Sequence, residues 1–177
     1  QNTIDFTGES AIVSAGDIYI TPETFATTIG ISGGTGTLNL SDEEIGFFNP
    51  IGGNLFIGEQ TFARGAVDIA DWDFAGLPLD NVYVYGKSIT ASDLSPGSNN
   101  LILSARDGDI YITQDVFDFG GAGSSINASG NITIAPETAN QQLSFGDATE
   151  GLSLSDFELA MLNAGGKVIF GDADNGV

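Results

Sequence analysis

Short segments in which apolar and polar residues alternate recur along the chain, and most of them open with glycine followed by aspartate or asparagine. They are Gly16-Asp-Ile-Tyr-Ile20, Gly53-Asn-Leu-Phe-Ile57, Asp80-Asn-Val-Tyr-Val84, Gly108-Asp-Ile-Tyr-Ile112, Gly130-Asn-Ile-Thr-Ile134 and Gly166-Lys-Val-Ile-Phe170. A period of two residues, with many β-branched side chains, predicts strands that bury one face. The segments begin about 22 to 37 residues apart, which fits one or two coils of a solenoid.

A longer internal repeat organises these segments. Residues 16–49 match residues 130–163 at a constant offset of 114 positions, the distance from Gly16 to Gly130, and one deletion later 53–58 meets 166–171. Composition alone does not produce agreement over separated blocks in one register. We therefore predict that 1–177 is a single solenoid segment built from an imperfect repeat of about 114 residues. Because neither end of the chain respects the repeat, we expect it to be part of a longer array.

Each copy of the repeat also contains a helix-start signal. Ser41 is followed three residues later by Glu44, and Ser155 by Glu158, and apolar residues then follow at helical spacing. This is the pattern of a capping box, which predicts one or two helical turns between strands in each copy. Pro50 in the first copy and Gly165 in the second are expected to mark the ends of these helices.

An antiparallel β-sandwich with a duplicated hairpin is the alternative architecture. Hairpin dipeptides such as Asn-Gly are scarce between the predicted strands, and sandwiches seldom repeat over this length. The pattern favours an all-β chain folded as a parallel β-helix, or β-solenoid, with short helical turns in some coils.

Composition narrows the range of partners and activities. The 25 Gly indicate frequent tight turns, and four Lys and Arg stand against 24 Asp and Glu, for a net charge of -20. Nucleic acid and anionic membranes are poor partners for such a chain, whereas cations are favoured ones. No apolar run approaches transmembrane length, so we expect no membrane insertion. The absence of Cys and His removes thiolate and imidazole chemistry, and we predict that the chain is not an enzyme.

The segment Leu152-Ser-Leu-Ser-Asp-Phe-Glu-Leu159, followed by the strand segment 166–171, resembles a repeat of large filamentous haemagglutinin-type secreted proteins of bacteria. The resemblance covers both ends of the chain well and residues 64–100 poorly. It implies a right-handed parallel β-helix, secretion to the bacterial surface, often with an outer-membrane partner, and a role as an adhesin or extracellular fibre. It brings no catalytic residues and no cofactor.

The C-terminal turn is the candidate metal site. Asp172, Asp174 and Asn175 place carboxylate and amide oxygens in one short turn, as at the opening of a calcium loop. No glutamate follows at the twelfth position, and an ordinary Asp/Asn/Gly turn is the favoured interpretation. Calcium is the one ion or cofactor that the residues suggest.

Trp72, with Asp71 and Asp73 on either side, is the candidate ligand-binding group. An aromatic ring between carboxylates is typical of saccharide sites, and paired carboxylates are the catalytic groups of glycosidases. The alternative is that these carboxylates are solvated while Trp72 packs on the next coil.

Together these patterns predict a structural protein of the bacterial cell surface, extracellular and forming a fibre, filament or adhesin shaft. Its expected partners are other copies of itself, end to end or laterally. A module that binds glycan or a host surface is the first alternative function. A β-helix enzyme that degrades polysaccharide is the second.

Overall fold

The computed structural model describes residues 11–24, 26–59, 65–72, 81–92, 94–97, 99–119, 121–146 and 151–171. This part of the chain is mostly β, and every pair of its strands is parallel, so the antiparallel sandwich alternative is wrong for it. The predicted all-β class and the predicted parallel pairing of strands are confirmed for the described residues.

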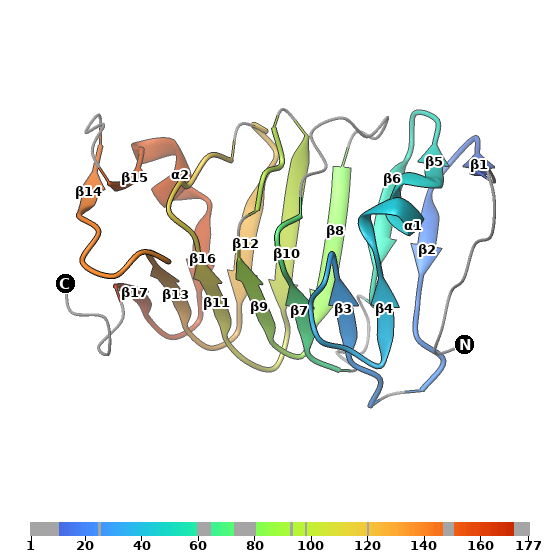
Figure 1. The fold of residues 1–177 in the computed structure, drawn as a ribbon, viewed down its shortest axis with the longest axis horizontal. Helices are drawn as coiled ribbons and strands as arrows, with labels where there is room; N and C mark the ends of the chain where they lie inside the picture. Colours follow the sequence, from blue (N-terminus) through green and yellow to red (C-terminus); the bar gives the residue numbers. More distant parts are fainter. Residues whose placement is uncertain are drawn as a thin grey trace.

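Two long sheets contain most of the strands (Figure 1). The six-stranded sheet consists, in spatial order, of β16 (Leu162–Ala164), β12 (Ser125–Ala128), β10 (Asn100–Ala105), β8 (Asn81–Gly86), β6 (Asn54–Ile57) and β2 (Ile18–Ile20). The seven-stranded sheet consists of β17 (Val168–Phe170), β13 (Ile132–Ala135), β11 (Ile110–Thr113), β9 (Ile89–Ser92), β7 (Val67–Ile69), β3 (Ile29–Ile31) and β4 (Leu38–Leu40). Two further pairs join β1 (Ile12–Ser14) to β5 (Phe48–Pro50) and β14 (Leu143–Phe145) to β15 (Leu152–Leu154).

The chain passes from one long sheet to the other at almost every step. From β6 onward the consecutive strands β7, β8, β9, β10, β11, β12 and β13 alternate between the seven-stranded and the six-stranded sheet. From β8 onward, each strand in this run pairs with the strand two places before it in the chain. We call one passage to the other sheet and back a circuit. Residues far apart in sequence are therefore neighbours along the long axis of the molecule (Figure 1).

The alternating segments bury the residues that their pattern predicts, in columns along the axis. One column of the six-stranded sheet contains, in register, Ile20, Ile57, Val84, Leu103 and Ile126. All of these side chains are buried, and a matching column in the other sheet contains Ile31, Ile69, Ala91, Ile112 and Ile134. Both columns belong to one hydrophobic cluster. Apolar burial of this kind contributes about 25 cal/mol per Å² of area removed from water, so the columns are the main source of stability.

The outermost strand β17 departs from the prediction. The alternation predicts that Val168 and Phe170 are buried like their counterparts, but Val168 is 38% exposed and Phe170 is only partly buried. The reason is that β17 pairs on one side only among the described strands, so no further strand covers its inner residues.

The 114-residue repeat returns as the same succession of elements. The pairs β1–β5, β2–β6 and β3–β4 recur as β12–β16, β13–β17 and β14–β15. The second copy is displaced by one sheet, however, because β2 lies in the six-stranded sheet and its counterpart β13 in the seven-stranded one. The repeat therefore does not contain a whole number of circuits.

The two capping boxes form as predicted. Ser41 caps α1 (Asp42–Gly46) and Ser155 caps α2 (Asp156–Ala160), with reciprocal bonds to Glu44 and Glu158. The predicted helix ends are wrong, because Pro50 lies in β5 and Gly165 follows β16, both beyond the helices. Each helix stops after five residues because the residue after its C-cap, Phe48 or Leu162, enters a strand that pairs with the neighbouring circuit.

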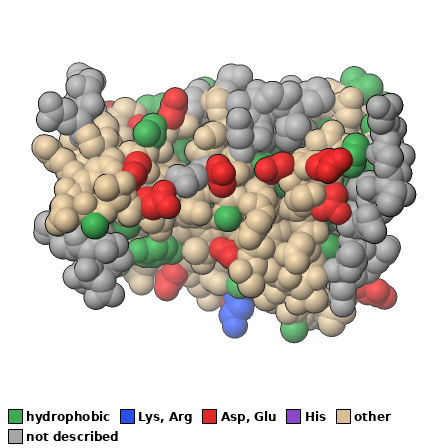
Figure 2. Space-filling model, in the orientation of Figure 1, with side chains coloured by type: hydrophobic (Ala, Val, Ile, Leu, Met, Phe, Trp, Pro, Cys, Tyr) green, Lys and Arg blue, Asp and Glu red, His purple; other side chains and the backbone are tan. Residues whose placement is uncertain are grey.

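Acidic side chains are spread along the surface. On the face drawn in Figure 2 they recur over the length of the molecule, whereas basic side chains are visible at one spot near its lower edge. None of the helices in the described ranges has both the length and the apolar character needed to cross a membrane.

Candidate functional site

In four strands of the six-stranded sheet, β2, β6, β8 and β10, an Asp or Asn lies at the start of the strand. These four side chains form a ladder of hydrogen bonds, which we call the Asx ladder (Asp17, Asn54, Asn81 and Asn100). Asp17 Oδ1 accepts from the backbone N–H and the side-chain amide of Asn54, both at 2.9 Å. Asn81 Nδ2 then donates to Asn54 Oδ1 at 2.6 Å, and Asn100 Nδ2 donates to Asn81 Oδ1 at 2.7 Å. The recurrence of Asp or Asn at this position has a simple cause: each side chain fixes the register of the next circuit.

We expect Asn81→Ala to lower the free energy of unfolding by about 1 to 3 kcal/mol, because it removes two amide bonds that each contribute about 0.5 to 1.5 kcal/mol net. Urea unfolding followed by circular dichroism measures this change. Asn163→Ala is the matched control, since Asn163 is exposed and its amide bond to Asn127 is long, 3.4 Å. Equal losses in both variants would contradict the ladder as a determinant of register.

The seven-stranded sheet has a shorter ladder of the same type. Asn131 N–H donates to Asp109 Oδ1 at 2.6 Å, and Lys167 N–H donates to Asn131 Oδ1 at 3.0 Å. Asp115, which follows β11 in the chain, acts similarly. It accepts hydrogen bonds from the backbone N–H groups of Glu137 and Thr138 and from the Thr138 hydroxyl. These bonds from Thr138, followed by that from Glu137, outweigh desolvation and hold the pKa of Asp115 below its usual value. The turn carboxylates are thus engaged in holding successive circuits together.

The outer face of the six-stranded sheet has an aromatic ladder (Tyr19, Phe56, Tyr83 and Tyr85). Tyr19 stacks on Phe56 with ring centroids 4.6 Å apart, and Phe56 stacks on Tyr83 at 4.5 Å, in both cases with planes 8° apart. The pKa of Tyr85 is raised above its ordinary value of 10.0. The largest cause is desolvation by burial, followed by the electrostatic effect of Tyr83 and then that of Tyr19. A sugar ring binds to an aromatic face, and here the faces between neighbouring rings are already occupied. The stacking between rings therefore contributes to the pairing of these strands.

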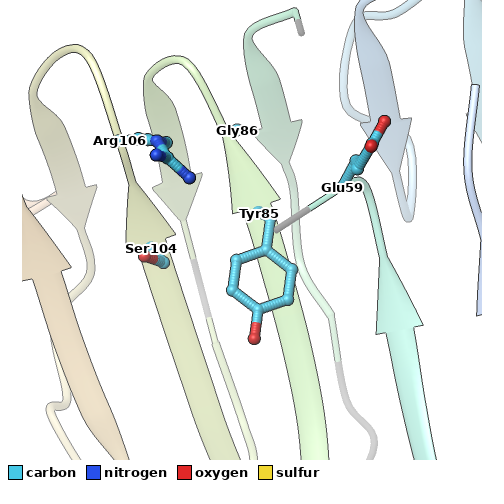
Figure 3. Close-up of a pocket in the computed structure, with 5 residues that line it drawn as sticks. All are labelled: Glu59, Tyr85, Gly86, Ser104 and Arg106. Atoms are coloured by element: carbon cyan, nitrogen blue, oxygen red, sulfur yellow. The ribbon is translucent and has the colours of Figure 1, made fainter. Parts of the chain in front are cut away.

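A small polar pocket lies where β6, β8 and β10 end (Figure 3). It is lined by Glu59, Tyr85, Gly86, Ser104 and Arg106 and has a volume of about 210 Å³. Figure 3 shows the Tyr85 ring between Ser104 on one neighbouring strand and Glu59 beyond the other. Ligand pockets usually enclose roughly 300 to 1,000 Å³, so this pocket is too small for an oligosaccharide or a typical cofactor.

The predicted ligand-binding residues are only partly described. Trp72 is 1% exposed and belongs to the hydrophobic core, as the packing alternative predicts, and its role in ligand binding stays a prediction. Asp71 is exposed, with a left-handed φ of 46°. Asp73 lies outside the described residues, so the Asp71–Asp73 pair stays a prediction.

The predicted calcium turn cannot be placed, since Asp172, Asp174 and Asn175 all lie outside the described residues. Over the described ranges, no group of three or more Asp and Glu side chains is arranged to hold a metal ion. Calcium at 172–175 stays a prediction.

Sequence reasoning missed the tight parallel loop within each copy. β3 and β4 pair with Ile29 opposite Leu38, and β14 and β15 with Leu143 opposite Leu152, a return of nine residues in both cases. The run Gly33-Gly-Thr-Gly36 was the available signal. A Cβ added to Gly34 would lie 2.0 Å from the Asp68 carbonyl oxygen, and Asp68 in turn accepts from Thr35 N–H at 2.6 Å. Glycine is thus needed for the loop to lie against β7.

Comparisons of the chain with protein-family models, with curated proteins and with solved structures gave no significant match.

Proposed function

We propose that this chain is a segment of a structural shaft at the bacterial cell surface, folded as a right-handed parallel β-helix. The observation that carries the proposal is the unbroken parallel ladder of β2, β6, β8, β10, β12 and β16, in which backbone hydrogen bonds run along the long axis. A structure whose hydrogen bonds and apolar columns run along one axis gains length by adding circuits, without any change to its core.

The right-handed coil is supported by the general geometry of parallel strands. A connection that leaves a strand, crosses to another layer and returns to a parallel neighbour in the same sheet is right-handed in about 98% of cases. The passage from β8 through β9 to β10 is of this kind, as is the passage from β10 through β11 to β12.

A passive shaft also suits the surface. The turn carboxylates Asp17, Asp109 and Asp115 accept hydrogen bonds from the next circuit, and the outward rings of Tyr19 and Phe56 stack on each other. These groups are used for stacking, which leaves few of them for catalysis or ligand binding. The net charge of -20 favours solubility of a long exposed rod. The bacterial surface location and the adhesin role rest on the resemblance of residues 152–171 to secreted filamentous proteins.

Electron microscopy of the parent protein tests the proposal. In the column from Ile20 to Leu162, 142 residues span five strand spacings of about 4.8 Å each, which corresponds to about 6 kDa per nm of axis. We expect mass measurements on single particles to give rods of this mass per length. Antibodies against the chain should label those rods on intact cells.

The control is the same labelling after permeabilisation. A signal that appears only in permeabilised cells would rule out the surface location. Compact particles, or rods of twice the expected mass per length, would contradict a single β-helical shaft.

A further inference from the structure

The small polar pocket beside Tyr85 lies in the middle of the six-stranded sheet (Figure 3). Its lining residues lie at the ends of β8 and β10 or within two residues after β6 and β10. The strands β2 and β12 pair with the outer sides of β6 and β10. The pocket is therefore formed by circuits that have neighbours on both sides.

The pocket exists because a small residue is the neighbour of an aromatic one in this sheet. Tyr85 on β8 pairs with Ser104 on β10, whereas two residues earlier Tyr83 pairs with the larger Ile102. The short serine side chain leaves a space of about 210 Å³ beside the Tyr85 ring. Both strands are paired in register, so this space is formed before a ligand arrives.

Two side chains of opposite charge line the pocket on either side of the Tyr85 ring. Figure 3 shows Arg106 on the side of β10 and Glu59 on the side of β6. Their charges cancel, so the pocket favours neither a simple anion nor a simple cation. The net charge of -20 on the chain further disfavours an anion alone. The pocket is thus complementary to a molecule that has one charge of each sign.

The Tyr85 ring and the size of the pocket narrow the ligand class further. A ligand ammonium group is attracted to the face of a tyrosine ring within about 6 Å of the ring centre. The Ser104 hydroxyl, which also lines the pocket, can both donate and accept a hydrogen bond. A space of about 210 Å³ is smaller than the roughly 300 to 1,000 Å³ of pockets for drug-sized ligands, so it fits a molecule about the size of a free amino acid.

We propose that this pocket binds a small zwitterion of the amino-acid class. The carboxylate of the ligand binds the Arg106 guanidinium, and its ammonium group lies between the Glu59 carboxylate and the Tyr85 ring. A guanidinium has five N–H donors and binds a carboxylate through two of them. A carboxylate has about four acceptor positions. Both side chains can therefore bind the ligand and keep their contacts within the chain.

NMR titration of isotope-labelled protein with glycine, β-alanine and γ-aminobutyrate tests the proposal. These zwitterions have the same two charges at increasing separation, whereas acetate and methylammonium have one charge each. We expect at least one zwitterion to shift the amide resonances of Tyr85 and Ser104. It should bind roughly tenfold more tightly than acetate or methylammonium, because a single charge makes only one of the two charge-assisted contacts. Unshifted resonances with all three zwitterions, or equally tight binding of acetate, would overturn the proposal.

Arg106→Gln and Glu59→Gln are each expected to weaken binding of the tightest zwitterion roughly tenfold, because each removes one charged partner of the ligand. The matched controls are Lys167→Gln and Glu43→Gln, which remove a like charge from exposed positions outside the pocket. We expect both controls to bind as the unmodified chain does. Equal losses in the controls would show that overall charge governs binding and would overturn the assignment to this pocket.

Ser104→Leu tests the space itself. The leucine side chain fills the volume beside Tyr85, so we expect the zwitterion to bind no longer. Ser104→Ala keeps the space open and is expected to retain binding. Circular dichroism verifies that both variants are folded. Unchanged binding in the folded Ser104→Leu variant would overturn the proposal.

The pocket ligand and the shaft function fail separately. Rods of the expected mass per length on the cell surface, together with no zwitterion binding, would leave the shaft function standing and remove the ligand. Zwitterion binding by a parent protein found only inside cells would retain the ligand site and remove the surface role.

Discussion

Replacing Gly58 with alanine is expected to lower the free energy of unfolding by about 2 to 5 kcal/mol. Gly58 has a left-handed φ of 87°, which costs an alanine about 1 to 2 kcal/mol. Its N–H donates to the Ile20 carbonyl of the preceding circuit at 2.9 Å, and a Cβ would lie 2.0 Å from the Tyr85 carbonyl oxygen of the next one. Relieving that overlap requires the circuits to move apart, at a further cost of about 1 to 3 kcal/mol.

Gly33→Ala separates the two contributions. Gly33 has nearly the same φ, 91°, but nothing lies within 4 Å of a Cβ placed there. We expect this control to lose only the conformational part, about 1 to 2 kcal/mol. Chemical denaturation of both variants under one set of conditions provides the comparison. Equal losses would show that spacing between circuits at Gly58 is not a constraint.

Replacing Trp72 with alanine is expected to cost about 3 to 5 kcal/mol, the usual loss when a large aromatic side chain is deleted from a core. Trp72 is 1% exposed and packs in the common hydrophobic cluster. A ligand-binding role at the surface would predict the opposite outcome, with binding lost and stability almost unchanged. The two possibilities are therefore separated by one unfolding curve.

Tyr19→Ala is the control for this substitution, because Tyr19 is 65% exposed and stacks on Phe56 at the end of its ladder. Its expected loss is about 0.5 to 1.5 kcal/mol. The chain has a single tryptophan, so fluorescence reports on Trp72 alone. We expect emission typical of an apolar environment and weak quenching by acrylamide, a neutral quencher that the net charge of -20 does not repel; strong quenching would contradict burial of the ring.

The strands and the helix starts could be predicted because their signals are local. Alternation around Ile110 and Ile112 selects the buried face from neighbours two residues away, and both side chains are buried. The Ser41 and Ser155 caps need a glutamate three residues on, and both boxes form. The helix ends could not be predicted in this way, since the residues after each helix pair with a strand from another circuit.

The hydrogen-bond and stacking partners of individual polar and aromatic residues could not be predicted, because they lie in neighbouring circuits. Asp109 and Asp115 accept hydrogen bonds from backbone N–H groups of the next circuit, which lie more than twenty residues away in the sequence. The Tyr83 ring stacks on Phe56, which lies in the neighbouring strand. Which ring meets which depends on circuit lengths, and these vary with the loops.

The amino-acid sequence by itself determined the parallel β character, the inward side of the alternating strands other than β17, and the repeat of 114 residues. Those properties follow from periodicity and from caps that act within a few residues. Only the tertiary structure decided that the second repeat is displaced by one sheet, that Trp72 is buried and that β17 pairs with one neighbour only among the described strands. These depend on how loops of unequal length bring distant strands together, and no short-range pattern contains that information.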